Sequence, residues 1–215
     1  ALPPLPVHPY GGLTAFFLLP LILWHGLRMG WWPAPDFLPP PQTWFSVGVL
    51  DNVLVRVYGQ FYRLATALTL HADLRHLWGN VAFGALFLAL LARLTGVGRA
   101  VWLTMLGGIL GNALTVLLRP RAVVSLGFST ALFASVGALA GLMASREAQR
   151  RKAVLPIAAG AALLAMLGTE GENTDYAAHV AGLVCGLALG LAEGWRLRRG
   201  WPALPQIPAG LLALA

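Results

Sequence analysis

The chain has 215 residues, of which 58% are hydrophobic and only 11% are charged, and its mean hydropathy is +0.71. Soluble domains carry about 25% charged residues, so this composition excludes a water-soluble globular domain and predicts an integral membrane protein. The net charge of +7 does not indicate nucleic-acid binding, because the basic residues lie at the ends of apolar runs, the pattern of loops that flank membrane spans.

Six apolar runs predict an all-α, polytopic membrane protein with six transmembrane helices. In chain order they cover residues 11–29, 74–94, 99–118, 125–145, 153–168 and 176–195. A bilayer core requires about 20 apolar residues of a spanning helix, and all but the fifth run approach this length. We expect one membrane domain over residues 1–200. The tail at residues 201–215 is too short and too rich in proline to span.

The first loop, at about residues 30–70, differs from the short connections elsewhere. It contains Trp31, Trp32 and Trp44 among several prolines, and then an amphipathic stretch at Val53–Leu70. Tryptophan is enriched where a membrane protein meets the lipid headgroups. The sequence therefore predicts that this loop lies in the membrane interface.

The distribution of basic residues predicts the orientation. With the N-terminus in the cytoplasm, nine of the 15 Arg and Lys residues fall in the inner loops: Arg93, Arg99, Arg146, Arg150, Arg151, Lys152, Arg196, Arg198 and Arg199. The other six spread over a longer outer surface: Arg28, Arg56, Arg63, Arg75, Arg119 and Arg121. The positive-inside rule then places both termini in the cytoplasm. The single lysine among many arginines favours a prokaryotic inner (plasma) membrane.

Polar side chains gather at one end of three predicted helices. The second, fourth and sixth runs have the same direction and begin near the outer face. Near these ends lie His76 and Asn80, then Ser129, then His179. Polar side chains inside membrane spans are costly and mark function by default. His76 and Asn80 are four residues apart and share one helix face.

Glycines predict that the helices of Ser129 and His179 pack closely. Glycine at every fourth position lets two backbones approach each other. One such stripe contains His179, Gly182, Gly186 and Gly190, and the other contains Ser129, Phe133, Gly137 and Gly141. Packing these stripes together would bring Ser129 and His179 within hydrogen-bonding reach.

A serine beside a neutral imidazole is the arrangement of a hydrolytic nucleophile and its base. Attack on a carbonyl creates an oxyanion that fixed donors must stabilise, and His76, Asn80 and the Ser129 N–H can supply them. Asp175 precedes His179 by four residues but falls in a predicted loop, so we expect a dyad rather than a triad. This chemistry requires no cofactor and no metal.

Together these residues resemble the rhomboid family of intramembrane serine proteases. The matching motifs are His71-x4-His76-x3-Asn80, Gly127-x-Ser129 and Ala178-His179-x2-Gly182-x3-Gly186, within a resemblance from about Tyr62 to Trp195. The resemblance implies that Ser129 is the nucleophile, His179 the general base, and His76 and Asn80 the oxyanion side chains. It also implies transmembrane protein substrates. Thr130 and Phe133 depart from the family, which often has glycine and tyrosine there.

Three other functions are compatible with parts of this pattern. A rhomboid-like protein could bind membrane clients without cutting them, although loss of Ser129 or His179 would be its expected signature. A haem or metal protein could use His71, His76 and His179, but a spacing of five residues does not place two histidines on one helix face. A small transporter would show repeated halves, and the sequence shows none.

Overall fold

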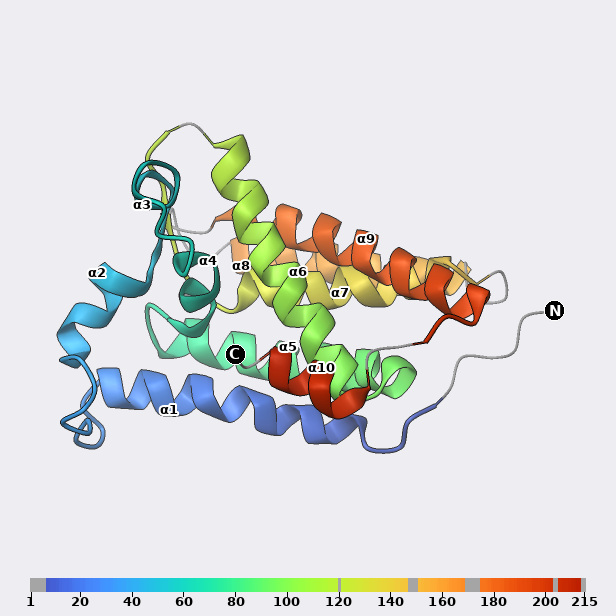
Figure 1. The fold of residues 1–215 in the computed structure, drawn as a ribbon, viewed down its shortest axis with the longest axis horizontal. Helices are drawn as coiled ribbons and strands as arrows, with labels where there is room; N and C mark the ends of the chain where they lie inside the picture. The colour runs from blue at the N-terminus through green and yellow to red at the C-terminus, as the bar shows by residue number, and fades with distance from the viewer. Residues whose placement is uncertain (1–6, 120, 147–150, 169–174, 203–204, 214–215) are drawn as a thin grey trace.

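The computed structural model describes residues 7–119, 121–146, 151–168, 175–202 and 205–213 (Figure 1). Each of the six predicted runs coincides with a helix. These are η1 (Gly11–Leu18) continuing into α1 (Leu19–Arg28), α5 (Leu74–Thr95), α6 (Val97–Leu118), α7 (Ser129–Ala144), α8 (Val154–Gly168) and α9 (Tyr176–Arg199). Among the described residues, the first segment, α5, α6 and α9 are long and apolar enough to cross a membrane, and α7 is shorter. The prediction of an all-α membrane bundle is confirmed.

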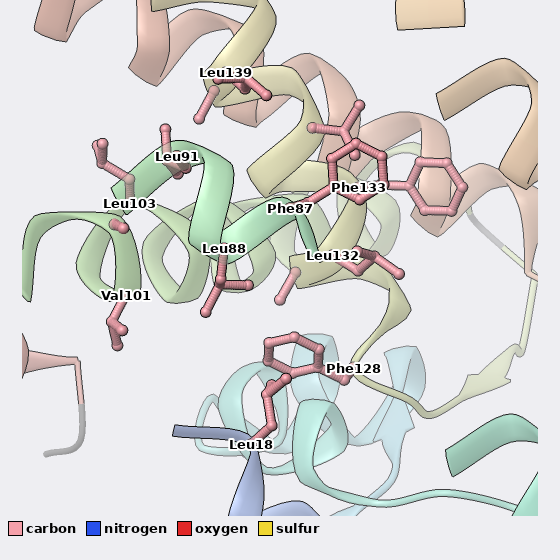
Figure 2. Close-up of a cluster of buried hydrophobic side chains, with 14 of the residues drawn as sticks. Leu18, Phe87, Leu88, Leu91, Val101, Leu103, Phe128, Leu132, Phe133 and Leu139 are labelled. Carbon is pink, nitrogen blue, oxygen red and sulfur yellow. The ribbon is translucent and has the colours of Figure 1, made fainter. Parts of the chain in front are cut away.

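Helix α7 is the centre of the bundle. It packs against α5, α6, α8 and α9, and every residue from Ser129 to Leu142 is buried. Figure 2 shows Phe128 beside Leu18 of the first segment. Leu132 and Phe133 belong to the same buried cluster as Leu88, Leu91 and Leu103 of α5 and α6. Because helices surround α7, its beginning lies inside the protein rather than against lipid.

The packing of α7 on α9 confirms the prediction from the glycine stripes. A Cβ atom added at Gly186 would lie only 2.0 Å from the carbonyl oxygen of Ala134, and one at Gly137 only 2.1 Å from that of Leu183. No side chain larger than hydrogen fits at either position. The two backbones therefore touch along their length, which fixes the separation of the side chains that they carry.

Helix α7 begins at Ser129, four residues after the start of the predicted run. Val124 and Ser125 instead form a short strand, β2, which pairs antiparallel with β1 (Leu50–Asp51) of the first loop. Gly127 then adopts φ +124°, a conformation that favours glycine. This turn ends the extended segment and places Ser129 in the first turn of α7.

The first loop folds into several short elements. They are η2 (Pro41–Thr43), α2 (Trp44–Gly48), α3 (Asn52–Tyr58), α4 (Arg63–Thr66) and η3 (Ala67–Thr69). The buried Arg63 side chain connects them, because it donates hydrogen bonds to the carbonyls of Ser46 and Val49. The Gly127 N–H donates to the carbonyl of Ala67 at 2.9 Å. The loop thus holds the segment that leads into Ser129.

The C-terminal tail contains one further helix, α10 (Gln206–Leu212), which lies against α6 (Figure 1). The Gln206 amide donates to the carbonyl of Thr95, and its oxygen accepts the Arg99 N–H. At Gly98, an added Cβ would collide with the Gln206 backbone. The tail therefore covers the junction of α5 and α6, a contact that the sequence did not predict.

Candidate active site

Ser129 and His179 form a direct contact between α7 and α9. The distance from Ser129 Oγ to His179 Nε2 is 2.7 Å, and both residues are buried. In the neutral tautomer with the proton on Nδ1, Nε2 accepts the hydrogen bond that the serine hydroxyl donates. His179 Nδ1 has no hydrogen-bond partner among the described residues. The structure thus brings together the two residues that the sequence paired.

The His179 ring is held from one side by Phe133. Their ring centroids are 4.8 Å apart and their planes differ by 22°. Phe133 is one helical turn after Ser129, so one face of α7 supplies both the hydroxyl and the ring that stacks on the imidazole. Phenylalanine thus makes the stacking contact without a hydroxyl group.

His76 and Asn80 lie on the face of α5 near the start of α7. The Asp73 carboxylate caps α5 by accepting the His76 N–H at 2.9 Å. A Cβ atom at Gly127 would lie 2.6 Å from His76 Nε2 and 3.5 Å from Ser129 Oγ. The His76 ring therefore lies directly against Gly127, where no larger side chain would fit.

Asn80 is 3% exposed, and its amide nitrogen has no hydrogen-bond acceptor among the described residues. An unpaired buried donor costs about 1–3 kcal/mol. The first N–H groups of a helix also lack intrahelical acceptors, which adds the backbone of Ser129 to the donors at this site.

Comparison with known proteins identifies the family. A family model described as Rhomboid domain matches residues 58–196. The chain belongs to the rhomboid family. It is 31% identical over 166 residues to rhomboid-like protease 5 of Toxoplasma gondii, covering 74% of this chain and 19% of that protein. It is 30% identical over 151 residues to the putative rhomboid protease YdcA of Bacillus subtilis, covering 68% and 71%.

A further relative of this rhomboid chain is named as inactive. Inactive rhomboid protein 1 of Drosophila melanogaster is 29% identical over 146 residues, covering 66% of this chain and 10% of that protein. The chain thus spans only a small part of the Toxoplasma and Drosophila relatives. Membership of the family and the apolar helices identify an integral, multi-pass membrane protein.

In this rhomboid, His71 lies beneath the segment that leads into Ser129. It is 1% exposed, its ring meets that of His76 edge-on at 5.2 Å, and its Nε2 accepts a long hydrogen bond of 3.5 Å from the Phe128 N–H. Burial, followed by the charges of His76 and His25, lowers the pKa of His71 from 6.5 to about 3. His71 is therefore a neutral acceptor that supports the segment before Ser129.

Asp175 is a site residue whose structural role the sequence did not predict. It is the N-cap of α9 and accepts the Ala178 N–H at 3.1 Å. The same carboxylate oxygen accepts a hydrogen bond from Arg119, at the end of α6, at 2.8 Å. Aspartate is a preferred N-cap residue, so its position just before α9 was a usable signal. Its partner Arg119 is distant in sequence, so no sequence pattern indicated this ion pair.

The arrangement of the potential metal ligands can be read from the described residues. No group of three or more His, Cys, Asp and Glu side chains among them is arranged to hold a metal ion. His71 and His76 approach each other as ring edge to ring face. His76 lies in the first turn of α5, and His71 contacts the segment before α7.

Proposed function

We propose that this chain is an intramembrane serine endopeptidase that hydrolyses peptide bonds in or next to transmembrane segments with a Ser129–His179 dyad. The observation that carries the proposal is the 2.7 Å contact between Ser129 Oγ and His179 Nε2 in a buried site. Two relatives named as proteases, in Toxoplasma and Bacillus, support the same reaction class.

In the proposed reaction, Ser129 Oγ attacks the carbonyl carbon while its proton passes to His179 Nε2. The oxyanion that forms accepts hydrogen bonds from His76, the Asn80 amide and the Ser129 N–H. Collapse of this intermediate breaks the C–N bond, and His179 gives its proton to the leaving amine. Water then attacks the acyl ester with His179 as the base, which releases the new carboxylic acid and restores the serine.

The proposed substrates are transmembrane proteins, and the lipid bilayer is the common environment of enzyme and substrate. A helix shields its peptide bonds, because each carbonyl oxygen accepts a hydrogen bond from the backbone N–H four residues later. A substrate must therefore unwind locally before Ser129 can reach a carbonyl. Small or helix-weakening residues near the scissile bond lower the cost of unwinding, and we expect cleavage to favour them.

We also propose that both termini are cytoplasmic and that the dyad faces the outer side of a prokaryotic inner membrane. The support is the distribution of arginines along the chain. A reporter fused after Leu212 tests this orientation. Alkaline phosphatase, which folds only outside the cytoplasm, should be inactive there, and a fluorescent protein that folds only inside should be bright.

A fluorophosphonate probe, which labels activated serines, tests the nucleophile. The wild-type chain should be labelled and should cleave a model transmembrane substrate, whereas Ser129→Ala should do neither and His179→Ala should react far more slowly. Ser135→Ala is the matched control, because Ser135 is a buried serine of α7 whose hydroxyl donates to the Leu132 carbonyl. Labelling that persists in Ser129→Ala would eliminate the proposed nucleophile.

The similarity to an inactive rhomboid supports a second candidate function, a catalytically silent protein that binds membrane clients. The same experiment separates the two. A silent protein would retain a transmembrane client without labelling or cleavage in the wild type. Labelling and cleavage that both depend on Ser129 would exclude it.

A further inference from the structure

A concave site lies at the end of α1, away from the dyad. The cavity has a volume of about 350 Å³. We call it the Arg28 pocket; its principal lining residues are Leu27, Arg28, Gly30, Trp31, Trp32 and Pro41. Neither Ser129 nor His179 lines it, so the proposed hydrolysis does not account for it.

The end of α1 builds this pocket through a helix-terminating motif. Gly30 has φ +72°, its N–H donates to the Leu27 carbonyl, and the Trp31 N–H donates to the Gly26 carbonyl. This pair of bonds is a Schellman motif, which reverses the chain after a helix. An added Cβ at Gly26 would lie 2.5 Å from the Trp32 ring, so glycine there lets the indoles fold back over α1.

The charge of Arg28 is not balanced by a carboxylate in the described part of the chain. Its Nη2 donates to the carbonyls of His71 and Ala72 at 2.9 and 3.1 Å, and the guanidinium lies 4.1 Å from the centroid of the Phe45 ring. Its Nε is buried without a hydrogen-bond partner there. The residues that line the pocket include no aspartate or glutamate.

The pocket combines a cation, two indoles and apolar residues at the end of a membrane span. These features fit a ligand that is anionic at one end and apolar at the other. Arginine matches phosphate geometry better than a point charge does. Tryptophan lies at the headgroup level of a bilayer, and Trp31 and Trp32 remain 45% and 38% exposed. A soluble anion would use the charge but not the indoles.

We propose that the Arg28 pocket binds the phosphodiester group of a membrane phospholipid. Arg28 donates to the phosphate oxygens, and Trp31 and Trp32 pack against the glycerol and the first acyl carbons. Arg28 also donates to the His71 carbonyl, so the residue that would bind the lipid contacts the residue that supports the start of α7. The site is distinct from the dyad and does not depend on peptidase activity.

Native mass spectrometry of the full chain, released from detergent, tests this proposal with two probes that share their acyl chains. Dioleoylphosphatidylglycerol should remain bound as one molecule per chain, and dioleoylglycerol, which lacks the phosphate, should not. Arg28→Gln should weaken phospholipid retention at least about tenfold, since it removes a charge-assisted contact. Arg56→Gln, at an exposed arginine of the first loop, should retain the lipid like the wild type.

Trp32→Leu provides a second variant if Arg28→Gln does not fold, because it leaves the bonds of Arg28 to the carbonyls intact. It should weaken retention several-fold. Equal retention of both lipids by the wild type, or wild-type retention of the phospholipid by a folded Arg28→Gln or Trp32→Leu variant, would overturn the proposal. Displacement of the phospholipid by equimolar inorganic phosphate would also overturn it, in favour of a soluble anion.

Discussion

Arg119 and Asp175 join the end of α6 to the beginning of α9, one helical turn before His179. The Nη1–Oδ1 distance is 2.8 Å, and the Asp175 side chain is 10% exposed while that of Arg119 is 40% exposed. The same carboxylate oxygen caps α9 through the Ala178 N–H. One aspartate thus fixes both where α9 starts and where that start lies relative to α6.

The first prediction separates these two roles of Asp175. Asp175→Asn keeps an N-cap acceptor but loses the charge, whereas Asp175→Ala loses both. We expect Asp175→Ala to lower the free energy of unfolding by about 1 kcal/mol, the usual cost of a lost cap, and Asn to cost less. Cleavage should fall in the same order, because the cap positions the turn that carries His179. Thermal unfolding and steady-state cleavage measure the two effects.

Arg119→Gln tests the ion pair itself. Exposed pairs contribute at most about 1 kcal/mol, so we expect a small loss of stability, reduced further at high salt. Arg121→Gln is the control, because Arg121 is exposed and forms no ion pair among the described residues. Equal salt dependence in the two variants would show that the Arg119–Asp175 pair does not stabilise the fold.

The second prediction concerns Asn80. Its amide nitrogen has no acceptor in the described part of the chain, so Asn80→Ala removes no hydrogen bond of that nitrogen to those residues. We expect the variant to unfold at nearly the wild-type temperature while kcat falls about 10²–10³-fold, the usual effect of losing an oxyanion donor. A normal kcat in Asn80→Ala would remove this residue from the proposed donor set.

The sequence predicted the elements whose pattern is local or periodic. Apolar runs gave the helices, and the four-residue spacing of Gly182 and Gly186 correctly indicated which face of α9 meets α7. The same reasoning placed His179 within reach of Ser129, because both lie near the start of helices with the same direction. Close backbone packing leaves few other arrangements for these two side chains.

The parts that the sequence did not predict depend on contacts between distant segments. The pairing of Leu50 with Ser125 has no periodic signature in strands of two residues. The contact of α10 with Gly98 depends on a single glutamine, Gln206. The two carbonyl acceptors of Arg63 could not be identified from the sequence.

The third prediction tests the contact between α7 and α9. In Gly186→Ala, the new methyl group would meet the Ala134 carbonyl at 2.0 Å, so the helices must separate. We expect a loss of stability in the range of overpacked cores, about 1–3 kcal/mol, and reduced fluorophosphonate labelling as Ser129 and His179 move apart. Gly79→Ala is the control, since a Cβ there meets nothing within 4 Å and alanine favours helix by about 1 kcal/mol.

The fourth prediction concerns pH and His71. The pKa of His71 is lowered from 6.5 to about 3 by burial, so between these values the unfolded chain binds a proton that the folded chain does not. Stability therefore rises with pH in this window and is lost as the pH falls below 6.5. At pH 4.5, two units below 6.5, the loss attributable to His71 is about 3 kcal/mol, since each pH unit corresponds to about 1.4 kcal/mol.

His71→Gln should remove this component while retaining a side-chain oxygen that can accept the Phe128 N–H. We therefore expect the variant to be less stable than the wild type at pH 7, but to lose less stability between pH 7 and pH 4.5. Thermal unfolding of both proteins in the same detergent at the two pH values measures the difference. Identical pH dependence would mean that the folded chain accommodates a charged His71, in which case the imidazole does not act as a permanently neutral support for the segment before Ser129.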